Sequence, residues 1–316
     1  MTLLLYSGGM PPANRKNPQR AASSDSQYSL MEFMVDFPDD TACLNWLWNT
    51  RYAIDGDKAY CPKDAEKTVF KRYETTQQRQ SWTCTKCGHH IHPTAGTVFH
   101  KSSTSLHLWF YAMYLMSSTR CGISAKQLER ELGVTYKTAW RMFHLIRHEL
   151  MDQDDDQMTG EVEMDEMYVG GSRKAAKGRY PRPKTTVFGM VERGGRVSAM
   201  VVDDNSMLSL YPHIGKTIAT GTRLFTDEHS VYMNMPKARF DHQSIRHRDG
   251  VYVSGDVHTQ TIEYFWMLVK NGIRGVYHSV SGKHLQGYLN EYVWRYNHRD
   301  DDAAMFLQLI LSAARP

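Results

Sequence analysis

The chain has no long apolar run, few cysteines and no strong excess of charge of one sign. No stretch approaches the roughly 18 consecutive apolar residues that cross a bilayer, so we expect no membrane partner. The opening run, residues 1–6, is too short for a secretion signal and lacks its basic start. Five cysteines in 316 residues are too few for a disulfide scaffold, and clustered cysteines in a cytosolic protein favour a metal site. We therefore expect a cytoplasmic protein.

The charges that are present are unevenly distributed. The net charge is +4 and the isoelectric point about 8.7, which permits a nucleic-acid partner without requiring one. Between Arg173 and Arg196 the chain carries eight basic residues and a single acid, Glu192. Apolar residues make up 41% of the chain and charged residues 23%, proportions typical of a globular protein with room for two or three domains.

The changes of pattern along the chain predict an α+β fold in four parts. Residues 1–27 have no periodicity and are expected to be a disordered lead-in. Residues 28–100 combine an N-terminal helix with a cysteine ribbon, and residues 101–151 contain successive helical patterns. After an acidic linker, residues 158–313 show strand-like runs followed by helical ones, which predicts a mixed sheet flanked by helices. The strand-like runs are 160–169, 185–193, 196–203 and 222–226, and the helical runs are 258–274 and 283–296.

Residues 101–151 have the pattern of two helices joined by a tight turn. Ser124-Ala-Lys-Gln127 is a capping box that begins one helix, and Gly133 supplies the turn. Thr135 can cap a second helix that runs to about Leu150. This order is typical of a DNA-binding helix-turn-helix, although an ordinary hairpin with a solvated charged face is the alternative. The residues of the second helix expected to contact DNA are Tyr136, Lys137, Thr138 and Arg141.

Three cysteines have the spacing of a zinc ribbon. Cys84-x-x-Cys87 is one metal knuckle, and Cys61-x-x-Asp64 has the spacing of a second knuckle in which aspartate replaces a cysteine. Structural Zn²⁺ needs four ligands in a tetrahedron, so three thiolates leave one position to fill. Asp64 can supply an oxygen, or one of three nearby histidines can fold back, namely His89, His90 or His92. The alternative is a ribbon that has lost its metal and is held by hydrophobic packing.

Three acids stand where a metal-dependent phosphoryl-transfer site needs carboxylates. Asp165 lies in one strand-like run, Asp227 ends another, and Glu263 lies on a helical run. An acid on a central strand is costly unless it is paired or binds metal, and sites gather at the carboxyl ends of strands. Because side chains alternate along a strand, Glu163 shares a face with Asp165 and Glu166 points the other way. Two strand carboxylates and one helix carboxylate can hold two hard divalent cations over a scissile phosphate.

The helical run with Glu263 also carries positive charge. Seven residues turn a helix by about 700°, so Lys270 lies almost directly above Glu263, and Arg274 continues the line. On an isolated helix such a stripe is more often a solvated face. Together with the two strand acids, it favours a site in which Lys270 and Arg274 contact the DNA backbone.

With these motifs the chain resembles the insertion-sequence transposases of the ISXO2-like group, which join a zinc ribbon and a helix-turn-helix to a DDE catalytic domain. The resemblance covers roughly residues 28–313. The stretches that carry it are Gly96-Thr-Val-Phe99, Gly122-Ile-Ser-Ala-Lys-Gln-Leu128, Thr135-Tyr-Lys-Thr-Ala-Trp-Arg-Met142, Glu163-Met-Asp-Glu-Met-Tyr-Val-Gly-Gly171, Thr226-Asp-Glu228, Ile262-Glu-Tyr-Phe-Trp266, Arg274-Gly-Val-Tyr-His-Ser-Val-Ser281, Tyr288-Leu-Asn-Glu-Tyr292 and Arg295-Tyr-Asn-His-Arg299.

The resemblance implies a ribonuclease-H-like catalytic core that binds Mg²⁺ (or Mn²⁺). The catalytic residues that it implies are Asp165, Asp227 and Glu263, the three metal ligands, with Lys270 as their basic partner. Members of the family often have Asn three residues before the helix Glu, and this chain has Gln260 there. Gln260 or His258 can therefore share the third catalytic position with Glu263.

The predicted function is transposition of an insertion sequence. The enzyme would bind terminal inverted repeats of double-stranded DNA, cut phosphodiester bonds with two metal ions and transfer the freed strand to target DNA, with Zn²⁺ in the ribbon. Because two element ends must be joined, a homodimer or higher oligomer on DNA is expected. The alternatives are a catalytically inactive DNA-binding regulator, a ribonuclease-H-type nuclease, and a scaffold that uses the ribbon for protein contacts.

Overall fold

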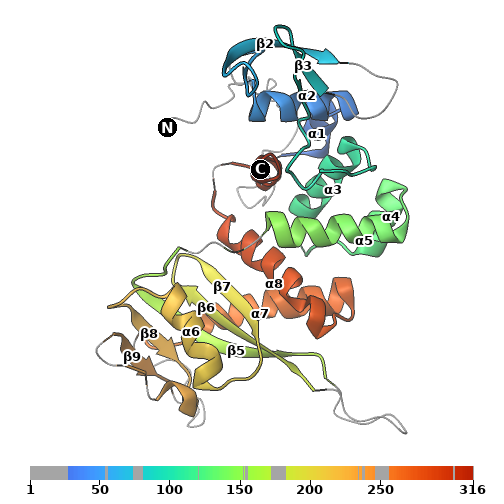
Figure 1. Cartoon of the computed structure of the whole chain (residues 1–316). Helices are drawn as coiled ribbons and strands as arrows, with labels where there is room; N and C mark the ends of the chain where they lie inside the picture. The colour runs from blue at the N-terminus through green and yellow to red at the C-terminus, as the bar shows by residue number, and fades with distance from the viewer. Residues whose placement is uncertain are drawn as a thin grey trace, which may run out of the picture.

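The chain folds into an N-terminal half with a small sheet and several helices and a C-terminal half built on a larger sheet, with helix α8 between them (Figure 1). The computed structural model describes residues 28–53, 56–73, 81–119, 121–151, 153, 156–171, 183–233, 235–236, 239–245, 256–301 and 303–315. The predicted lead-in, residues 1–27, lies outside the described residues, as does the basic stretch 173–182.

The N-terminal half begins with two helices and a four-stranded antiparallel sheet, on which the second helix packs. The elements are α1 (Leu30–Asp36), α2 (Asp40–Arg51), β1 (Lys58–Cys61), β2 (Glu66–Tyr73), β3 (Ser81–Cys84) and β4 (His90–Ile91). Ser29 and Glu32 form a capping box at α1, and the carboxylate of Asp39 caps α2. Trp48 of α2 stacks on Trp82 of β3 with 4.7 Å between ring centroids. This stack joins α2 to the sheet.

Three more helices lie where the sequence predicts them. They are α3 (Leu106–Ser118), α4 (Ala125–Leu132) and α5 (Tyr136–Leu145), and α5 continues into a π-helical turn, η1 (Ile146–Leu150). The Ser124 hydroxyl accepts a hydrogen bond from the Gln127 backbone N–H at 3.1 Å and begins α4. Gly133 ends α4 in the left-handed conformation at φ +64°, and Thr135 caps α5. That this pair of helices binds DNA stays a prediction.

The C-terminal half is built on a five-stranded mixed sheet with the strand order β7-β6-β5-β8-β9. The consecutive strands β5, β6 and β7 pair antiparallel, each with the next. Strand β8 runs parallel to β5, and β9 runs parallel to β8. Their bounds are β5 (Glu161–Val169), β6 (Thr185–Glu192), β7 (Val197–Val202), β8 (Arg223–Thr226) and β9 (Asp241–Ser244). The four predicted strands are confirmed. Strand β9 was missed because its four residues are all polar and show no apolar alternation.

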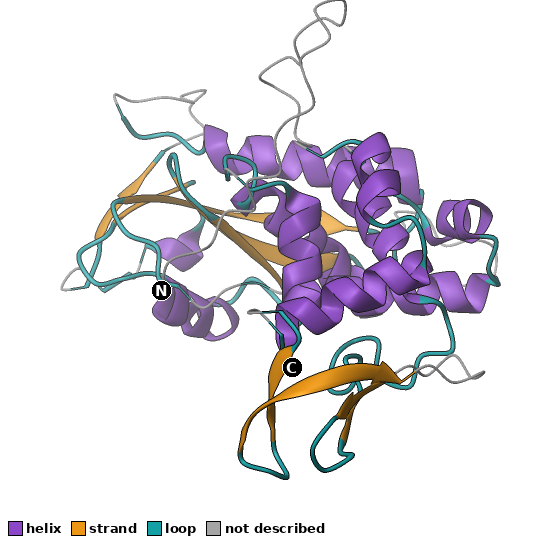
Figure 2. Ribbon diagram, turned by 90° about the horizontal axis from the view of Figure 1, so that it is seen from above, coloured by secondary structure: helices purple, strands orange, loops and turns teal. Residues whose placement is uncertain are grey.

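Helices cover both faces of this sheet (Figures 1 and 2). Helix α6 (Met207–Thr217), which was not predicted, packs on one face against Met164 and Phe188. Helices α7 (Gln260–Gly272) and α8 (Gly282–Asn297) pack on the other face, joined by a π-helical turn, η4 (Ile273–Tyr277). The two predicted helical runs in this region are confirmed. Strand β5 therefore lies in the middle of the sheet with helices on both sides.

The last helix, α9 (Met305–Ala313), returns to the N-terminal half and packs against α3 (Figure 1). The ring of Phe306 lies 5.0 Å from that of Tyr28 and 5.5 Å from that of Phe33. The two ends of the described chain therefore share one core. In the part of the chain that the structure describes, no helix is long and apolar enough to span a membrane.

Candidate functional site

Asp165 lies on the central strand β5, and its side chain faces α7. Nε1 of Trp266, on α7, donates a hydrogen bond to Asp165 Oδ2 at 3.1 Å. The indole fits there because Gly189, the partner of Asp165 on β6, has no side chain. A Cβ atom at Gly189 would lie 2.4 Å from the Trp266 ring. The first predicted acid is thus held between the sheet and the helix.

Asp227 follows directly after β8, beside β5. In the parallel register of the two strands, Glu163 lies opposite Phe225. Asp165 and Asp227 each follow two residues later, which brings them to the same edge of the sheet. Burial, followed by the negative charges of Glu166 and Asp227, raises the pKa of Asp165 to about 7. Two of the three predicted acids therefore lie close enough for their charges to interact.

Glu166 is a further acid at this edge, and sequence reasoning left it out of the site. Its carboxylate accepts a hydrogen bond from the hydroxyl of Tyr232. Burial and then the charge of Asp227 raise the pKa of Glu166. Because side chains alternate along β5, Glu166 points to the opposite face from Asp165. Asp227 lies just beyond the end of β8, and its charge adds to the effect of burial in raising the pKa of both Asp165 and Glu166. The consecutive pair Asp165-Glu166 was the only signal in the sequence.

Glu263 lies in the first turn of α7 and is exposed. Its Oε1 accepts a hydrogen bond from the Thr259 hydroxyl at 2.9 Å. Residues three apart are neighbours on a helix surface, so Glu263 lies beside Trp266, whose indole bonds the first acid. Among the described residues, the three predicted carboxylates do not form a group whose ligand atoms all lie within 4.8 Å of one another. The structure therefore places Glu263 on the exposed surface of the first turn of α7, and its role as a third ligand stays a prediction.

The other predicted positions around α7 differ in their surroundings. Lys270 and Arg274 are exposed, as side chains that contact DNA must be. Gln260 is exposed at the first residue of the helix. Nδ1 of His258 lies 3.1 Å from Glu163 Oε1, so this histidine faces Glu163.

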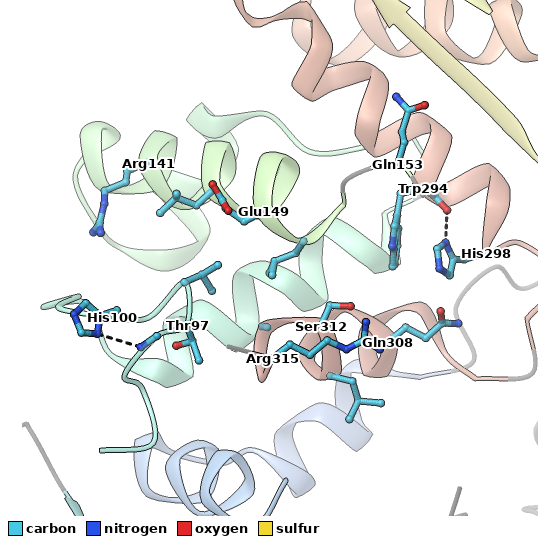
Figure 3. Close-up of a pocket in the computed structure, with 16 residues that line it drawn as sticks. Thr97, His100, Arg141, Glu149, Gln153, Trp294, His298, Gln308, Ser312 and Arg315 are labelled. Atoms are coloured by element: carbon cyan, nitrogen blue, oxygen red, sulfur yellow. Dashed lines mark hydrogen bonds between the residues drawn. The ribbon is translucent and has the colours of Figure 1, made fainter. Parts of the chain in front are cut away.

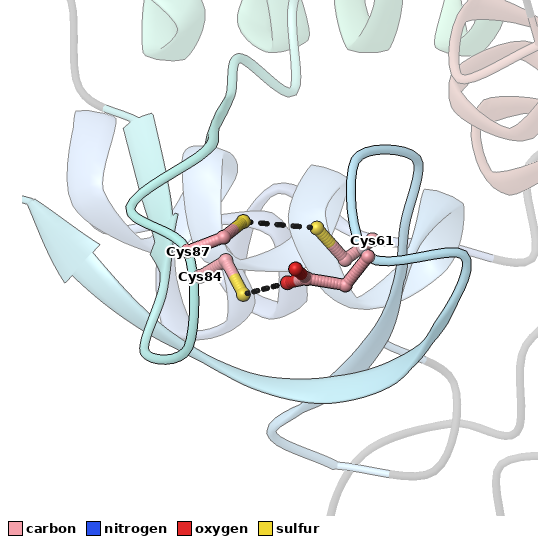
Figure 4. A group of neighbouring side chains, drawn as sticks. Cys61, Cys84 and Cys87 are labelled. Atoms are coloured by element: carbon pink, nitrogen blue, oxygen red, sulfur yellow. Dashed lines mark hydrogen bonds between the residues drawn. The ribbon is translucent and has the colours of Figure 1, made fainter.

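A second group of potential ligands lies in the four-stranded sheet (Figure 4). Cys61 ends β1, Cys84 ends β3, and Asp64 and Cys87 lie in the turns that follow these strands. The Sγ atoms of Cys61 and Cys87 are 3.5 Å apart, and Cys84 Sγ donates to Asp64 Oδ2 at 3.2 Å. The four ligand atoms all lie within 4.8 Å of one another. The structure thus gathers the four residues that the knuckle spacing selected.

Asp64 completes this group in preference to the nearby histidines. Hydrogen bonds from the thiols, above all that of Cys87, lower the pKa of Asp64. Nδ1 of His90 lies 3.0 Å from the Thr83 hydroxyl and 3.1 Å from that of Ser81, so this ring is engaged elsewhere. Three thiols and a carboxylate at this separation suit a tetrahedral ion that prefers sulfur.

The outer face of α5 carries the predicted DNA contacts. Tyr136, Lys137 and Arg141 are exposed, and Thr138 is half-buried beside the helix cap at Thr135. A pocket of about 870 Å³ lies along one flank of this face, between α5, the loop 96–100 and α9 (Figure 3). Its polar lining includes Thr97, His100, Arg141, Glu149, Gln308 and Arg315.

A second groove, of about 600 Å³, lies at the N-terminal end of α5. It is formed where α4 and α5 meet the turn that follows α7. Its lining combines cations with aromatic rings, namely Lys126, Arg130, Tyr136, Trp140, Tyr277 and Tyr288. The exposed stripe of α5, formed by Tyr136, Lys137 and Arg141, therefore lies between this pocket and this groove, and basic side chains line both.

Most of the C-terminal half is similar to a known protein family. Residues 157–297 match the family model of the ISXO2-like transposase domain. The matched region contains β5, β8 and α7, and with them all three predicted acids. The family resemblance drawn from the sequence motifs is thus confirmed.

The chain is also similar to a protein of Halobacterium salinarum described as an uncharacterized protein in transposable element ISH50. The two are 28% identical over 256 residues, which cover 75% of this chain and 84% of the relative. The similarity therefore extends well beyond the domain that matches the family model.

Proposed function

We propose that the protein is a DDE-type transposase of an insertion sequence, with Asp165, Asp227 and Glu263 as ligands for Mg²⁺ (or Mn²⁺). The observation that carries the proposal is the pairing of Asp165 with Asp227 at adjoining ends of parallel strands within a transposase domain. Burial, followed by the negative charges of Glu166 and Asp227, raises the pKa of Asp165. A divalent cation would neutralise this charge, and carboxylate oxygens suit a hard ion. The mixed five-stranded sheet with helices on both faces supports a ribonuclease-H-like core.

The residues of the site bind and orient the reacting groups. Asp165, Asp227 and Glu263 would hold the divalent ions, which would supply the Lewis acidity needed to activate an attacking water or 3′-hydroxyl and to stabilise the leaving oxygen. Trp266 donates a hydrogen bond to Asp165 and so restricts rotation of this carboxylate. Lys270 and Arg274, exposed on the helix beyond Glu263, contact the phosphates that flank the scissile bond.

The N-terminal half supplies specific DNA binding. The exposed stripe of α5 enters the major groove of the terminal inverted repeat, where Lys137 and Arg141 contact phosphates or base edges. The hollows on either side, with Lys126 and Arg130 by one and Arg315 by the other, accept the flanking backbones. A homodimer or larger assembly then holds two element ends against target DNA.

Zn²⁺ is the ion best suited to the cysteine group. Cys61, Cys84 and Cys87 would supply thiolates and Asp64 an oxygen, completing four ligands. The ion would link the turn after β1 to the turn after β3 and hold the small sheet together.

The proposal is tested by cleavage and strand transfer on DNA that carries candidate element ends, with Mg²⁺ or with chelator. We expect cleavage and joined strands only with the ion, and no cleavage by Asp165→Asn or Asp227→Asn. Both variants should still bind end DNA, because α5 is unchanged. Full cleavage by both variants would overturn the assignment of the acids.

Two other outcomes point to other functions. Binding of end DNA without cleavage by the unaltered protein would identify a DNA-binding regulator. Cleavage without joined strands would identify a nuclease.

A further inference from the structure

Glu163 is a fully buried acid on the same face of β5 as Asp165, and the proposed chemistry makes no use of it. Its Oε2 accepts hydrogen bonds from two backbone N–H groups at the start of α7, those of Thr261 at 2.7 Å and Ile262 at 3.0 Å. Its Oε1 accepts from the Thr261 hydroxyl at 2.9 Å and from Arg193 Nε at 2.8 Å. Both oxygens are thus occupied by donors, which leaves Glu163 unsuited to bind a metal ion.

Arg193 extends these contacts from the turn after β6. Its guanidinium donates to the carbonyl oxygens of Asp256 at 2.7 Å and His258 at 3.0 Å, which precede α7. The same group lies over the ring of Phe225 on β8, 4.1 Å from the ring centroid. One ion pair therefore contacts β5, β8 and α7 at once.

Each of these contacts lies next to a proposed metal ligand in the sequence. Glu163 precedes Asp165 by two residues on β5, and Phe225 precedes Asp227 by two residues on β8. Ile262, whose N–H is bonded to Glu163, directly precedes Glu263 on α7. We propose that the Glu163–Arg193 pair is the positioning device that sets the three acid-bearing segments at the separation needed to bind the ions. This inference rests on the proposed function.

The energetics favour a geometric role over a purely stabilising one. A buried ion pair often adds little net stability over an apolar pair of the same shape, because two charges must be stripped of water. Removing the guanidinium is costly, since the fully buried carboxylate of Glu163 then loses its arginine partner, whereas Arg193 also pairs with Glu161 at 3.2 Å. The Glu163–Arg193 pair therefore favours a single arrangement of β5, β8 and α7. Groups that orient ligands without touching the ion commonly change metal affinity about 10- to 100-fold when altered.

The test measures Mn²⁺ binding to the full chain by electron paramagnetic resonance, counting only the binding that Asp165→Asn abolishes. In Glu163→Gln, which keeps the shape but loses the charge, we expect affinity to fall about 10- to 100-fold. Saturating Mn²⁺ should restore DNA cleavage by this variant. The matched control is Glu291→Gln, because Glu291 is also fully buried and paired with arginines, but at the contact between η1 and α8.

The outcomes separate the inference from the proposed function. Loss of affinity in Glu163→Gln with unchanged affinity in Glu291→Gln supports the inference. Unchanged affinity in Glu163→Gln, or equal losses in both variants, overturns it while leaving the proposed function in place. If the unaltered protein shows no Mn²⁺ binding that depends on Asp165, the proposed function fails and the inference fails with it.

A second variant keeps the test decisive if Glu163→Gln does not fold. Arg193→Lys retains the positive charge but loses the planar group that donates to two carbonyls and stacks on Phe225. We expect a smaller loss of Mn²⁺ affinity, again absent in Glu291→Gln. Wild-type affinity in Arg193→Lys would overturn the inference.

Discussion

The protonation of Asp165 has the clearest consequence at the scale of single residues. Burial and then the charges of Glu166 and Asp227 raise its pKa to about 7. A raised pKa means that the folded protein holds this proton more tightly than the unfolded chain does. The ion-free protein therefore loses stability as the pH rises through about 7. The same proton competes with a cation for the carboxylate.

We expect Mn²⁺ affinity to rise between about pH 6 and about pH 8, because Asp165 loses its proton in this range. In Asp165→Asn no carboxylate titrates there. This variant should lose ion binding, yet in chelator at about pH 8 it should be more stable than wild type by about 1–3 kcal/mol. Mn²⁺ titrations and thermal unfolding measure the two effects. A pH-independent affinity would contradict the assignment.

Residue type and placement single out Asp165, Asp227 and Glu263 as candidates, because acids at strand ends and on an amphipathic helix are informative locally, and their role as metal ligands stays a prediction. The residues around them were not predictable in this way. Trp266 bonds Asp165 only because β6 places Gly189 opposite that acid and leaves room for the indole. Such relations depend on strand pairing, which no local pattern encodes.

Among the secondary-structure elements, the turns after β1 and β3 determine the metal chemistry of the small sheet. Asp64→Cys would supply a fourth thiolate, a ligand that Zn²⁺ prefers to a carboxylate in structural sites. We expect Zn²⁺ to be retained more tightly by about an order of magnitude, and less tightly in Cys84→Ser. Zinc content after dialysis against graded chelator measures both. Equal zinc loss from all three proteins would favour a ribbon held by packing alone.

Helix α5 is the element whose surface predicts a salt-dependent interaction. If Lys137 and Arg141 each neutralise a phosphate, Lys137→Ala and Arg141→Ala should each reduce the slope of log affinity against log salt by about 1. Fluorescence anisotropy with end DNA over a range of salt concentrations gives the slopes. Lys216→Ala, exposed on α6 across the sheet, is the matched control. Unchanged slopes in both α5 variants would favour the plain helical hairpin.

At the scale of the whole molecule, a buried network joins the two halves. Arg147, in the turn that continues α5, donates from Nε to Glu291 Oε2 of α8 at 2.8 Å. The two side chains are 2% and 0% exposed. Although burial opposes ionisation, the charges of Arg147 and then Arg295 hold the pKa of Glu291 below its usual range. Arg147 also lies between the rings of Phe143 and Tyr288.

Arg147→Met should destabilise the protein by about 3–5 kcal/mol, because Glu291 would lose its buried partner. Equilibrium unfolding in urea measures the change. Because the pKa of Glu291 is lowered in the folded state, the contribution of its charge is present above the ordinary carboxyl pKa and is lost as the pH falls below it. A loss below about 1 kcal/mol at neutral pH would show that the network does not hold the halves together.

Local chemistry in the chain was sufficient for most helices, four strands of the larger sheet and the grouping of Cys61, Asp64, Cys84 and Cys87. Caps, glycine turns and short cysteine spacings act over a few residues, so they can be recognised in the sequence alone. The polar strand β9, the return of α9 to the first core and the Arg147–Glu291 pair, 144 residues apart, needed the tertiary structure. They depend on which surfaces meet, and that choice minimises exposed apolar area and unpaired charge across the whole molecule.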